Sequence, residues 1–200
     1  MLQSIVYLGA AVEFLGGWAY LRDTLKGVTQ PNRVTFFFWA LAPLIATAAE
    51  LADGVTFAAI PVFMAGFIPL LIFVASFVNK NAYWKLKIYD YVYGGIAALA
   101  LVLWAITNEP LLAIMFAIIS DGLATVPTLI KSWRFPESET GISYGASIFA
   151  ALTGFFVVGA WNLSEYAFLI YLVLINSAIF FAIYRVKISR IFGLARAAKK

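Results

Sequence analysis

Two acidic residues lie in the middle of long apolar segments, where an ionisable side chain is unusual. Glu13 and Asp121 each stand about eleven residues into an apolar run, or ~16 Å along a helix. At the centre of a lipid bilayer such a group costs at least about 2.5 kcal/mol, so it should face the protein interior or a wet cavity. We interpret both residues as midplane acids that can carry a proton. The alternative is a protonated carboxyl group that hydrogen-bonds a neighbouring helix.

Small residues surround both acids at the same helical offsets, four residues before and three and four residues after. They are Gly9, Gly16 and Gly17 around Glu13, and Ala117, Ala124 and Thr125 around Asp121. Small residues on one helix face allow a second helix to approach closely. Both acids are therefore predicted to face other helices.

Further residues inside the apolar runs have side chains suited to contacting a solute or to bending a helix. The predicted substrate-cavity residues are Trp39, Thr125, Thr128 and Asn176. The Asn176 amide suits a solute hydroxyl as well as it suits a bond to another helix, and Trp39 also fits simple packing. Pro127 and Pro43 each free a backbone carbonyl and bend a helix. We predict gating kinks at both, with static helix shape as the alternative.

The composition indicates that lipid is the solvent for most side chains. The chain has 200 residues, of which 64% are hydrophobic and 12% charged, and its mean hydropathy is +0.92. A soluble domain of this size cannot bury so much apolar surface. The sequence contains no cysteine and no histidine, which excludes disulfides, thiolate nucleophiles and Ser-His mechanisms. We expect no enzyme activity, no catalytic residue, no metal site and no cofactor.

Seven apolar segments are long enough to cross a membrane as helices, which takes about 20 residues each. They are residues 2–21, 34–52, 57–78, 88–107, 110–132, 143–160 and 166–184. The segments are too long and too continuously apolar for the strands of a barrel. The predicted fold is an all-α membrane protein of seven transmembrane helices.

The basic residues orient these spans. With seven spans, all 14 Lys and Arg residues fall on one side, whereas the other side carries the acids Glu50, Asp53, Glu109 and Glu165. Positive-inside bias makes the basic side cytoplasmic and places the N-terminus outside. Water should solvate Glu50 and Asp53 at the outer end. The basic tail is predicted to anchor to anionic lipid, rather than to bind nucleic acid.

The two halves of the chain correspond in hydropathy and charge. At a shift of 108 residues Glu13 meets Asp121, and Asn32 meets Thr140. Parallel duplication of a three-helix unit needs one extra helix between the copies. We therefore predict a first three-helix bundle at residues 1–80, a linker helix at 81–108, a second bundle at 109–187 and a basic cytoplasmic tail at 188–200.

The segment Thr125–Trp133 resembles the helix, kink-proline and basic-loop motif of the SWEET and PQ-loop transporters. That resemblance implies a 3+1+3 bundle with an extracellular N-terminus, a gating role for Pro127 and solute contact at Asn176. Thr128 stands where that group has Gln, and Ala19 stands where the first unit has Pro. The segments Pro31–Thr35 and Ser76–Lys85 resemble those of small uncharacterised bacterial multi-pass membrane proteins, which implies a bacterial plasma membrane.

These features together favour a small-solute transporter that works by alternating access between the two units. Glu13 or Asp121 would couple transport to protons, and the alternative is passive transport. A receptor or scaffold on the same bundle, without translocation, is the second hypothesis. The expected partners are a small-molecule solute and the bilayer. Homo-oligomerisation stays open, since Gly141 and Gly145 form a GxxxG packing face.

Overall fold

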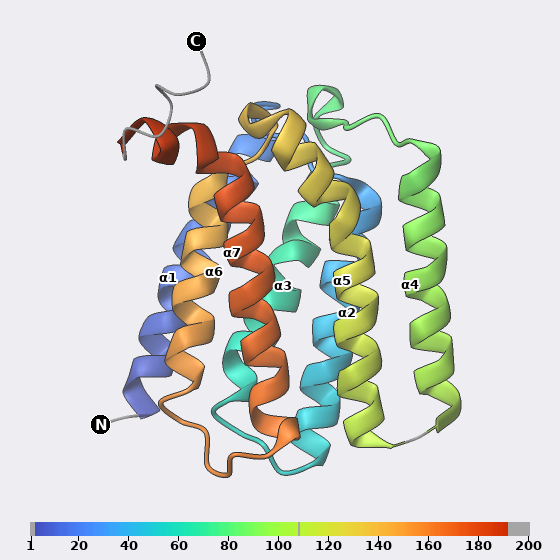
Figure 1. The fold of residues 1–200 in the computed structure, drawn as a ribbon, viewed down its shortest axis with the longest axis vertical. Helices are drawn as coiled ribbons and strands as arrows, with labels where there is room; N and C mark the ends of the chain where they lie inside the picture. Colours follow the sequence, from blue (N-terminus) through green and yellow to red (C-terminus); the bar gives the residue numbers. More distant parts are fainter. Residues whose placement is uncertain (1–2, 108, 192–200) are drawn as a thin grey trace.

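A computed structural model describes residues 3–107 and 109–191, and within these ranges the chain folds into seven α-helices and no strand (Figure 1). The helices are α1 Gln3–Leu25, α2 Arg33–Ala52, α3 Ala59–Ala75, α4 Ile88–Thr107, α5 Pro110–Arg134, α6 Gly141–Gly154 and α7 Leu163–Ile191. Two short 3₁₀ helices, η1 Lys80–Ala82 and η2 Pro136–Ser138, lie in the connections. The predicted all-helical class is confirmed. The predicted tail at 188–200 begins in the last turn of α7, and residues 192–200 lie outside the described residues.

Five of these helices are long and apolar enough to cross a membrane: α1, α2, α4, α5 and α7. Two helices are shorter than the spans that hydropathy predicted. α3 has 17 residues and α6 has 14, which is only ~21 Å of helix for α6. The apolar run after Gly154 leaves the helix and turns, and the Glu165 carboxylate accepts bonds from the backbone N–H groups of Gly159 and Ala160 at 2.5 and 2.8 Å. Hydropathy alone does not indicate that α6 ends at Gly154.

Six helices form a ring, and α4 stands outside it (Figure 1). α3 lies between α1 and α2, and α7 lies between α5 and α6. The ring closes because α1 packs on α6 and α2 packs on α5. α4 packs mainly on α5 and also touches α2. Every helix except α4 therefore borders the centre of the ring.

The start of α2 is fixed by a buried cap that also holds α4. The Asn32 side-chain oxygen accepts bonds from the N–H groups of Val34 and Thr35 at 3.1 and 3.3 Å, the usual geometry of a helix N-cap. The Asn32 amide donates to Asp90 at 2.7 Å, and Asp90 is fully buried at the start of α4. This one side chain therefore joins the start of α2 to the start of α4.

The two ends of the bundle differ in charge. The α1–α2, α3–α4 and α5–α6 connections and the C-terminal end of α7 lie at one end, which we call the basic end (Figure 1). The α2–α3, α4–α5 and α6–α7 connections lie at the opposite end, which we call the acidic end. All described Lys and Arg side chains come from the segments at the basic end. The predicted separation of charges is thus present in the described residues.

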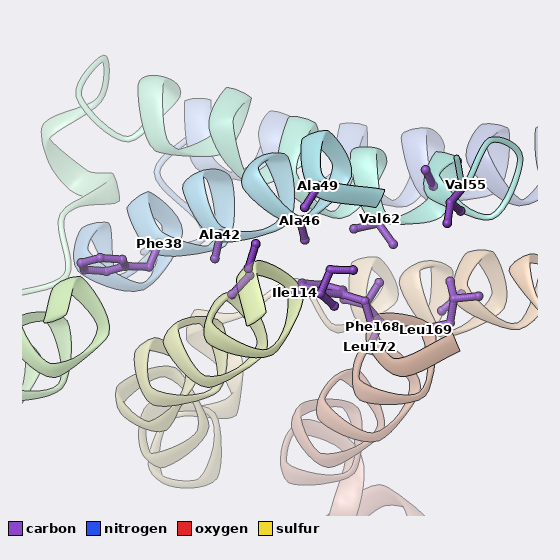
Figure 2. Close-up of a cluster of buried hydrophobic side chains, with 14 of the residues drawn as sticks. Phe38, Ala42, Ala46, Ala49, Val55, Val62, Ile114, Phe168, Leu169 and Leu172 are labelled. Carbon is purple, nitrogen blue, oxygen red and sulfur yellow. The ribbon is translucent and has the colours of Figure 1, made fainter. Parts of the chain in front are cut away.

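The core consists of two clusters of buried apolar side chains. The larger one contains several alanines of α2 and α5, together with Ile114, Phe168 and Leu169 (Figure 2). The smaller one lies towards the basic end and contains Tyr20, Trp39 and other aromatic residues. Large apolar side chains also cover the outside of the bundle, such as the 66% exposed Leu15 and the 71% exposed Ile106.

Helix α1 approaches α6 and α3 through the glycines that flank Glu13. A Cβ atom added at Gly16 would collide with the Ala146 side chain and would lie 3.3 Å from the Cα atom of Ser143. One added at Gly9 would collide with Thr153, and one at Gly17 with Ile68. The GxxxG face is also used inside the chain, because Gly141 packs on Tyr184 and Gly145 on Phe180. The predicted close approach is confirmed around Glu13.

Substituting Gly16 by alanine is expected to lower the free energy of unfolding by about 1–3 kcal/mol, because the new methyl group overpacks the contact with α6. Gly95→Ala is the matched control, since nothing lies within 4 Å of a Cβ atom added there on α4. It should raise stability by up to about 1 kcal/mol, through helix propensity alone. Denaturant titration of the purified variants measures both effects, and equal stabilities would contradict a tight contact at Gly16.

Candidate functional site

An internal cavity lies within the ring, and every ring helix contributes to its wall. Its volume is about 50 Å³, measured as the space open to the centre of a water molecule. Since a site needs roughly 10–15 Å³ on this measure to hold one water, the cavity has room for a few. Five residues predicted for the functional site line it, namely Glu13, Trp39, Pro43, Asp121 and Asn176. These residues are far apart in sequence, and only the ring brings them together.

Glu13 is buried on α1 and keeps one oxygen atom without a partner. Its side chain is 3% exposed, and Oε1 accepts a bond from Ser147 Oγ on α6 at 3.1 Å. Its Oε2 atom is buried and has no hydrogen-bond partner. A buried polar atom normally has a partner, so this oxygen is suited to receive a proton or a ligand.

Asp121 is equally buried, but its surroundings differ. Its Oδ2 atom accepts a 2.5 Å hydrogen bond from the hydroxyl group of Tyr171 on α7. A short bond from a neutral donor stabilises the ionised carboxylate. The two acids match in sequence position, yet Asp121 accepts a short bond from a tyrosine, whereas Glu13 accepts a longer bond from a serine and has a buried oxygen without a partner.

Thr125 and Thr128 do not line the cavity, contrary to the sequence prediction. The Thr125 hydroxyl accepts a 2.7 Å bond from the indole N–H of Trp39 and donates to the Asp121 carbonyl. The Thr128 hydroxyl donates to Thr35 Oγ1 at 2.9 Å. Both side chains lie on the face of α5 that packs against α2. They therefore fasten these two helices instead of contacting the cavity.

Pro127 also lies away from the cavity wall, on the same contact between α2 and α5. The Thr35 hydroxyl donates to the Ala124 carbonyl at 2.8 Å, three residues before the proline. This bond satisfies a backbone acceptor in the stretch where proline disturbs the helix. Pro43, in contrast, lines the cavity, and Thr47 donates to its carbonyl at 2.8 Å.

Asn176 lines the cavity from α7, but part of its amide is already engaged. Its Nδ2 atom donates to the Leu172 carbonyl of its own helix at 2.9 Å. Neither a bond to another helix nor a solute contact is needed to hold the side chain in place.

Four aromatic rings form the wall towards the basic end. Tyr20, Phe36, Trp39 and Tyr144 all line the cavity. Their ring centroids are 5.2 Å apart for Tyr20–Phe36, 5.1 Å for Phe36–Trp39, 6.1 Å for Trp39–Tyr144 and 6.4 Å for Tyr20–Tyr144. Such tilted and edge contacts are the favoured geometries of aromatic pairs. The rings therefore support one another as a continuous wall.

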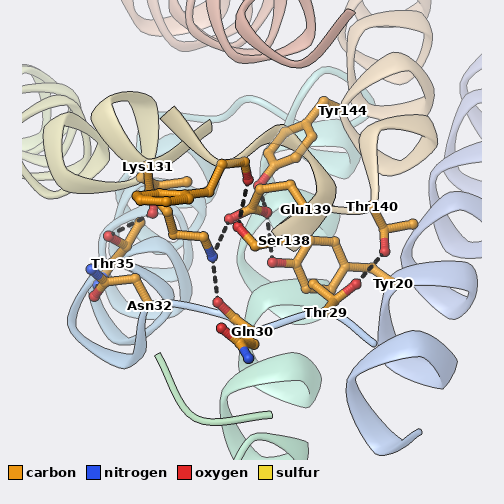
Figure 3. A network of polar contacts seen from close by, with 12 residues as sticks. Tyr20, Thr29, Gln30, Asn32, Thr35, Lys131, Ser138, Glu139, Thr140 and Tyr144 are labelled. Carbon is orange, nitrogen blue, oxygen red and sulfur yellow. Dashed lines mark hydrogen bonds and ion pairs between the residues drawn. The ribbon is translucent and has the colours of Figure 1, made fainter. Parts of the chain in front are cut away.

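A buried ion pair lies between this aromatic wall and the basic end (Figure 3). Lys131 Nζ is 2.6 Å from Glu139 Oε1, and neither side chain is exposed. The hydroxyl groups of Tyr20 and Tyr144 both donate to Glu139 Oε2 at 2.7 Å. Lys131 also donates to the Gln30 carbonyl. The two tyrosines thus touch the cavity with their rings and the ion pair with their hydroxyl groups.

Further polar contacts extend this network across the basic end. Thr29 and Thr140 share a 2.6 Å hydrogen bond, and Thr140 donates to Asp23 at 3.0 Å. These contacts join the connection after α1 to the start of α6 (Figure 3). Sequence reasoning missed the network, because Lys131 looked like one more residue of a basic loop. An available signal was that acids such as Glu139 lie among the basic residues of that side.

Glu50 is an acid that sequence reasoning placed wrongly. Its side chain is 1% exposed, and neither carboxylate oxygen has a hydrogen-bond partner, although water was expected to solvate it. The side chain follows the buried face of α2 that carries Ala46 and Ala49. Among the described residues, no three acidic side chains gather closely enough to hold a metal ion.

Comparisons with protein-family models, with curated proteins and with solved structures found no match to this chain.

Proposed function

We propose that this chain is an integral membrane protein that carries a small solute by alternating access. The observation that supports this function best is the cavity, which lies at the centre of the ring and holds both midplane acids. Transporters with internal repeats place their substrate sites between the repeats, near the middle of the bilayer.

Membrane insertion of all seven helices is supported by the distribution of side chains. The bundle is apolar outside and partly polar inside, the reverse of a soluble protein. α3 and α6 are short, but apolar residues lie on both sides of α3 and continue α6 towards the acidic end. Positive-inside bias would place the basic end in the cytoplasm and the N-terminus outside.

The proposed architecture is two parallel three-helix units, α1–α3 and α5–α7, joined by α4. In each unit the third helix lies between the first two. Exchanging the units maps the contact of α1 with α6 onto the contact of α5 with α2, as a two-fold axis requires. Asn32 and Thr140, which correspond at the shift of 108, both precede the first residue of a helix. This arrangement supports the SWEET and PQ-loop resemblance.

In this proposal the network at the basic end is the closed gate. It joins the units, because Tyr20 and Gln30 come from the first and Lys131, Glu139 and Tyr144 from the second. Separating the units at this end would break the network and open the cavity to the cytoplasm. Pro43, on the cavity wall, is better placed than Pro127 to bend with that motion.

A receptor or scaffold on the same bundle is the second candidate. The large number of buried, hydrogen-bonded polar groups at the basic end favours it, because such a network can simply hold one rigid state. The two candidates differ in whether the cavity is ever reached from both sides of the membrane.

The absence of cysteine permits a direct test with Ser143→Cys, a substitution on the cavity wall. A carrier should let a membrane-impermeant thiol reagent reach this position from either side, in intact cells and in inverted vesicles. Lys85→Cys and Asp53→Cys are exposed controls at the basic and acidic ends, and each should react from one side only. Reaction of Ser143→Cys from a single side, with both controls behaving as expected, would leave the receptor as the better reading.

A further inference from the structure

The cavity is acidic, and nothing basic lines it among the described residues. Glu13 and Asp121 contribute two carboxyl groups to the wall. Lys131 lies beyond Tyr20 and Tyr144, and its charge is already matched by Glu139 at 2.6 Å. A buried carboxylate needs a proton or a positive partner, because its charge is otherwise uncompensated in a medium of low dielectric constant.

Most hydrogen-bond donors on the wall are already committed to protein partners, and the Ser143 hydroxyl and one N–H group of Asn176 are the exceptions. The indole N–H of Trp39 is directed at Thr125, and the hydroxyl groups of Tyr20 and Tyr144 are directed at Glu139. The Ser147 hydroxyl donates to Glu13. The wall also offers the unpartnered Glu13 Oε2 atom as an acceptor, together with the aromatic rings that line it. A neutral polyol would need donors as well as acceptors, whereas an ammonium group needs acceptors only.

The aromatic wall suits the same ligand chemistry. Tyr20, Phe36, Trp39 and Tyr144 pack as one connected group beside the acids. Aromatic faces attract cations through the ring quadrupole, and cages of such rings bind quaternary ammonium groups. Carboxylates and rings around one cavity therefore form a site for an organic cation.

We propose that the transported solute is a small organic cation, an amine or quaternary ammonium compound, held by Glu13 and by the aromatic wall. This inference rests on the proposed carrier function. Glu13 would hold a proton while the cavity contains no cation and would release it when a cation binds. One proton would then cross the membrane against one cation, which makes the carrier an exchanger.

The groups that face Glu13 fit this exchange. Asp121 on α5 is the other acid, and Tyr171 on α7 donates to it. Tyr20 on α1 and Tyr144 on α6 donate to Glu139, whose charge Lys131 matches. The residues that α2 and α3 add to the wall carry no charge. Of the two acids on the wall, Glu13 is the one with a buried oxygen that has no hydrogen-bond partner, and the exchange of a proton for a cation is assigned to it.

The test compares two thiol reagents of similar size on Ser143→Cys, the cationic trimethylammonium-ethyl and the anionic sulfonatoethyl methanethiosulfonates. The cationic reagent should react at least about tenfold faster, because an acidic cleft concentrates cations. Adding Glu13→Gln should reduce this ratio severalfold. Adding Glu109→Gln, an exposed acid at the start of α5, should leave it unchanged.

A second measurement uses tetramethylammonium as the probe. It should slow the labelling of Ser143→Cys, whereas the neutral tert-butanol should not, and Glu13→Gln should weaken the protection by at least about 30-fold. The cation inference would be overturned if both reagents reacted at equal rates and tetramethylammonium gave no protection. If labelling still occurred from both sides of the membrane, the carrier proposal would stand. Protection combined with labelling from one side only would overturn the carrier and support a cation-binding receptor. The reagent ratio and the protection measured on Ser143→Cys with Glu13 intact test the cation inference even if Glu13→Gln fails to fold.

Discussion

Replacing Lys131 by methionine is expected to lower the free energy of unfolding by about 3–5 kcal/mol, because it leaves the Glu139 carboxylate buried without its cation. Glu139 would keep only the bonds from Tyr20 and Tyr144. Thermal and denaturant unfolding of the purified protein measure the loss. The same substitution should also speed the labelling of Ser143→Cys from the basic end, since the gate proposed there would be weakened.

Two controls separate the ion pair from general damage. The double variant Lys131→Met/Glu139→Gln removes both charges and should be more stable than Lys131→Met alone. Arg22→Met breaks the exposed ion pair with Asp23, in which the Arg22 side chain is 56% exposed, and should cost about 1 kcal/mol or less. Similar losses for Lys131→Met and Arg22→Met would show that the buried pair contributes no more than a surface pair.

Substituting Glu13 by glutamine is expected to abolish proton-driven accumulation of tetramethylammonium. Vesicles that are two pH units more acidic inside should accumulate this cation by up to roughly 100-fold in a one-for-one exchange, since each unit is worth about 1.36 kcal/mol. The direction follows from exchange, because protons that leave the vesicle drive the cation in. Glutamine keeps the size of the side chain but cannot release a proton. Exchange at equal pH should persist at cation concentrations that saturate the variant.

Asp121→Asn is the matched comparison for this prediction. Its carboxyl group is already held by the 2.5 Å bond from Tyr171, so we expect it to keep one protonation state through the cycle and its variant to keep most of the accumulation. Full accumulation by Glu13→Gln would refute its coupling role. A loss of accumulation in Asp121→Asn alone would assign the coupling role to Asp121. Accumulation driven by an acidic exterior would indicate co-transport in place of exchange.

The sequence by itself determined the elements and the depth of the acids. The seven helices follow from long apolar runs and from local start signals such as Asn32 and Pro110, which depend on neighbouring residues only. The burial of Glu13 and Asp121 follows from their position in those runs and from the small residues at helical offsets around them. The placement of the basic residues at one end follows from the number of helices. Each of these features depends on residues that lie close together in the sequence.

Only the tertiary structure decided which side chains meet. The rotation of α5 turns Thr125 and Thr128 towards α2, and the rotation of α2 buries Glu50, although hydropathy does not specify either angle. The pairing of Lys131 with Glu139 depends on how η2 folds back over the end of α5, and the difference between the two acids depends on whether Tyr171 or Ser147 lies opposite. These contacts depend on the relative rotation and translation of helices that are distant in sequence. Packing of the whole ring sets those quantities, and no local pattern encodes them.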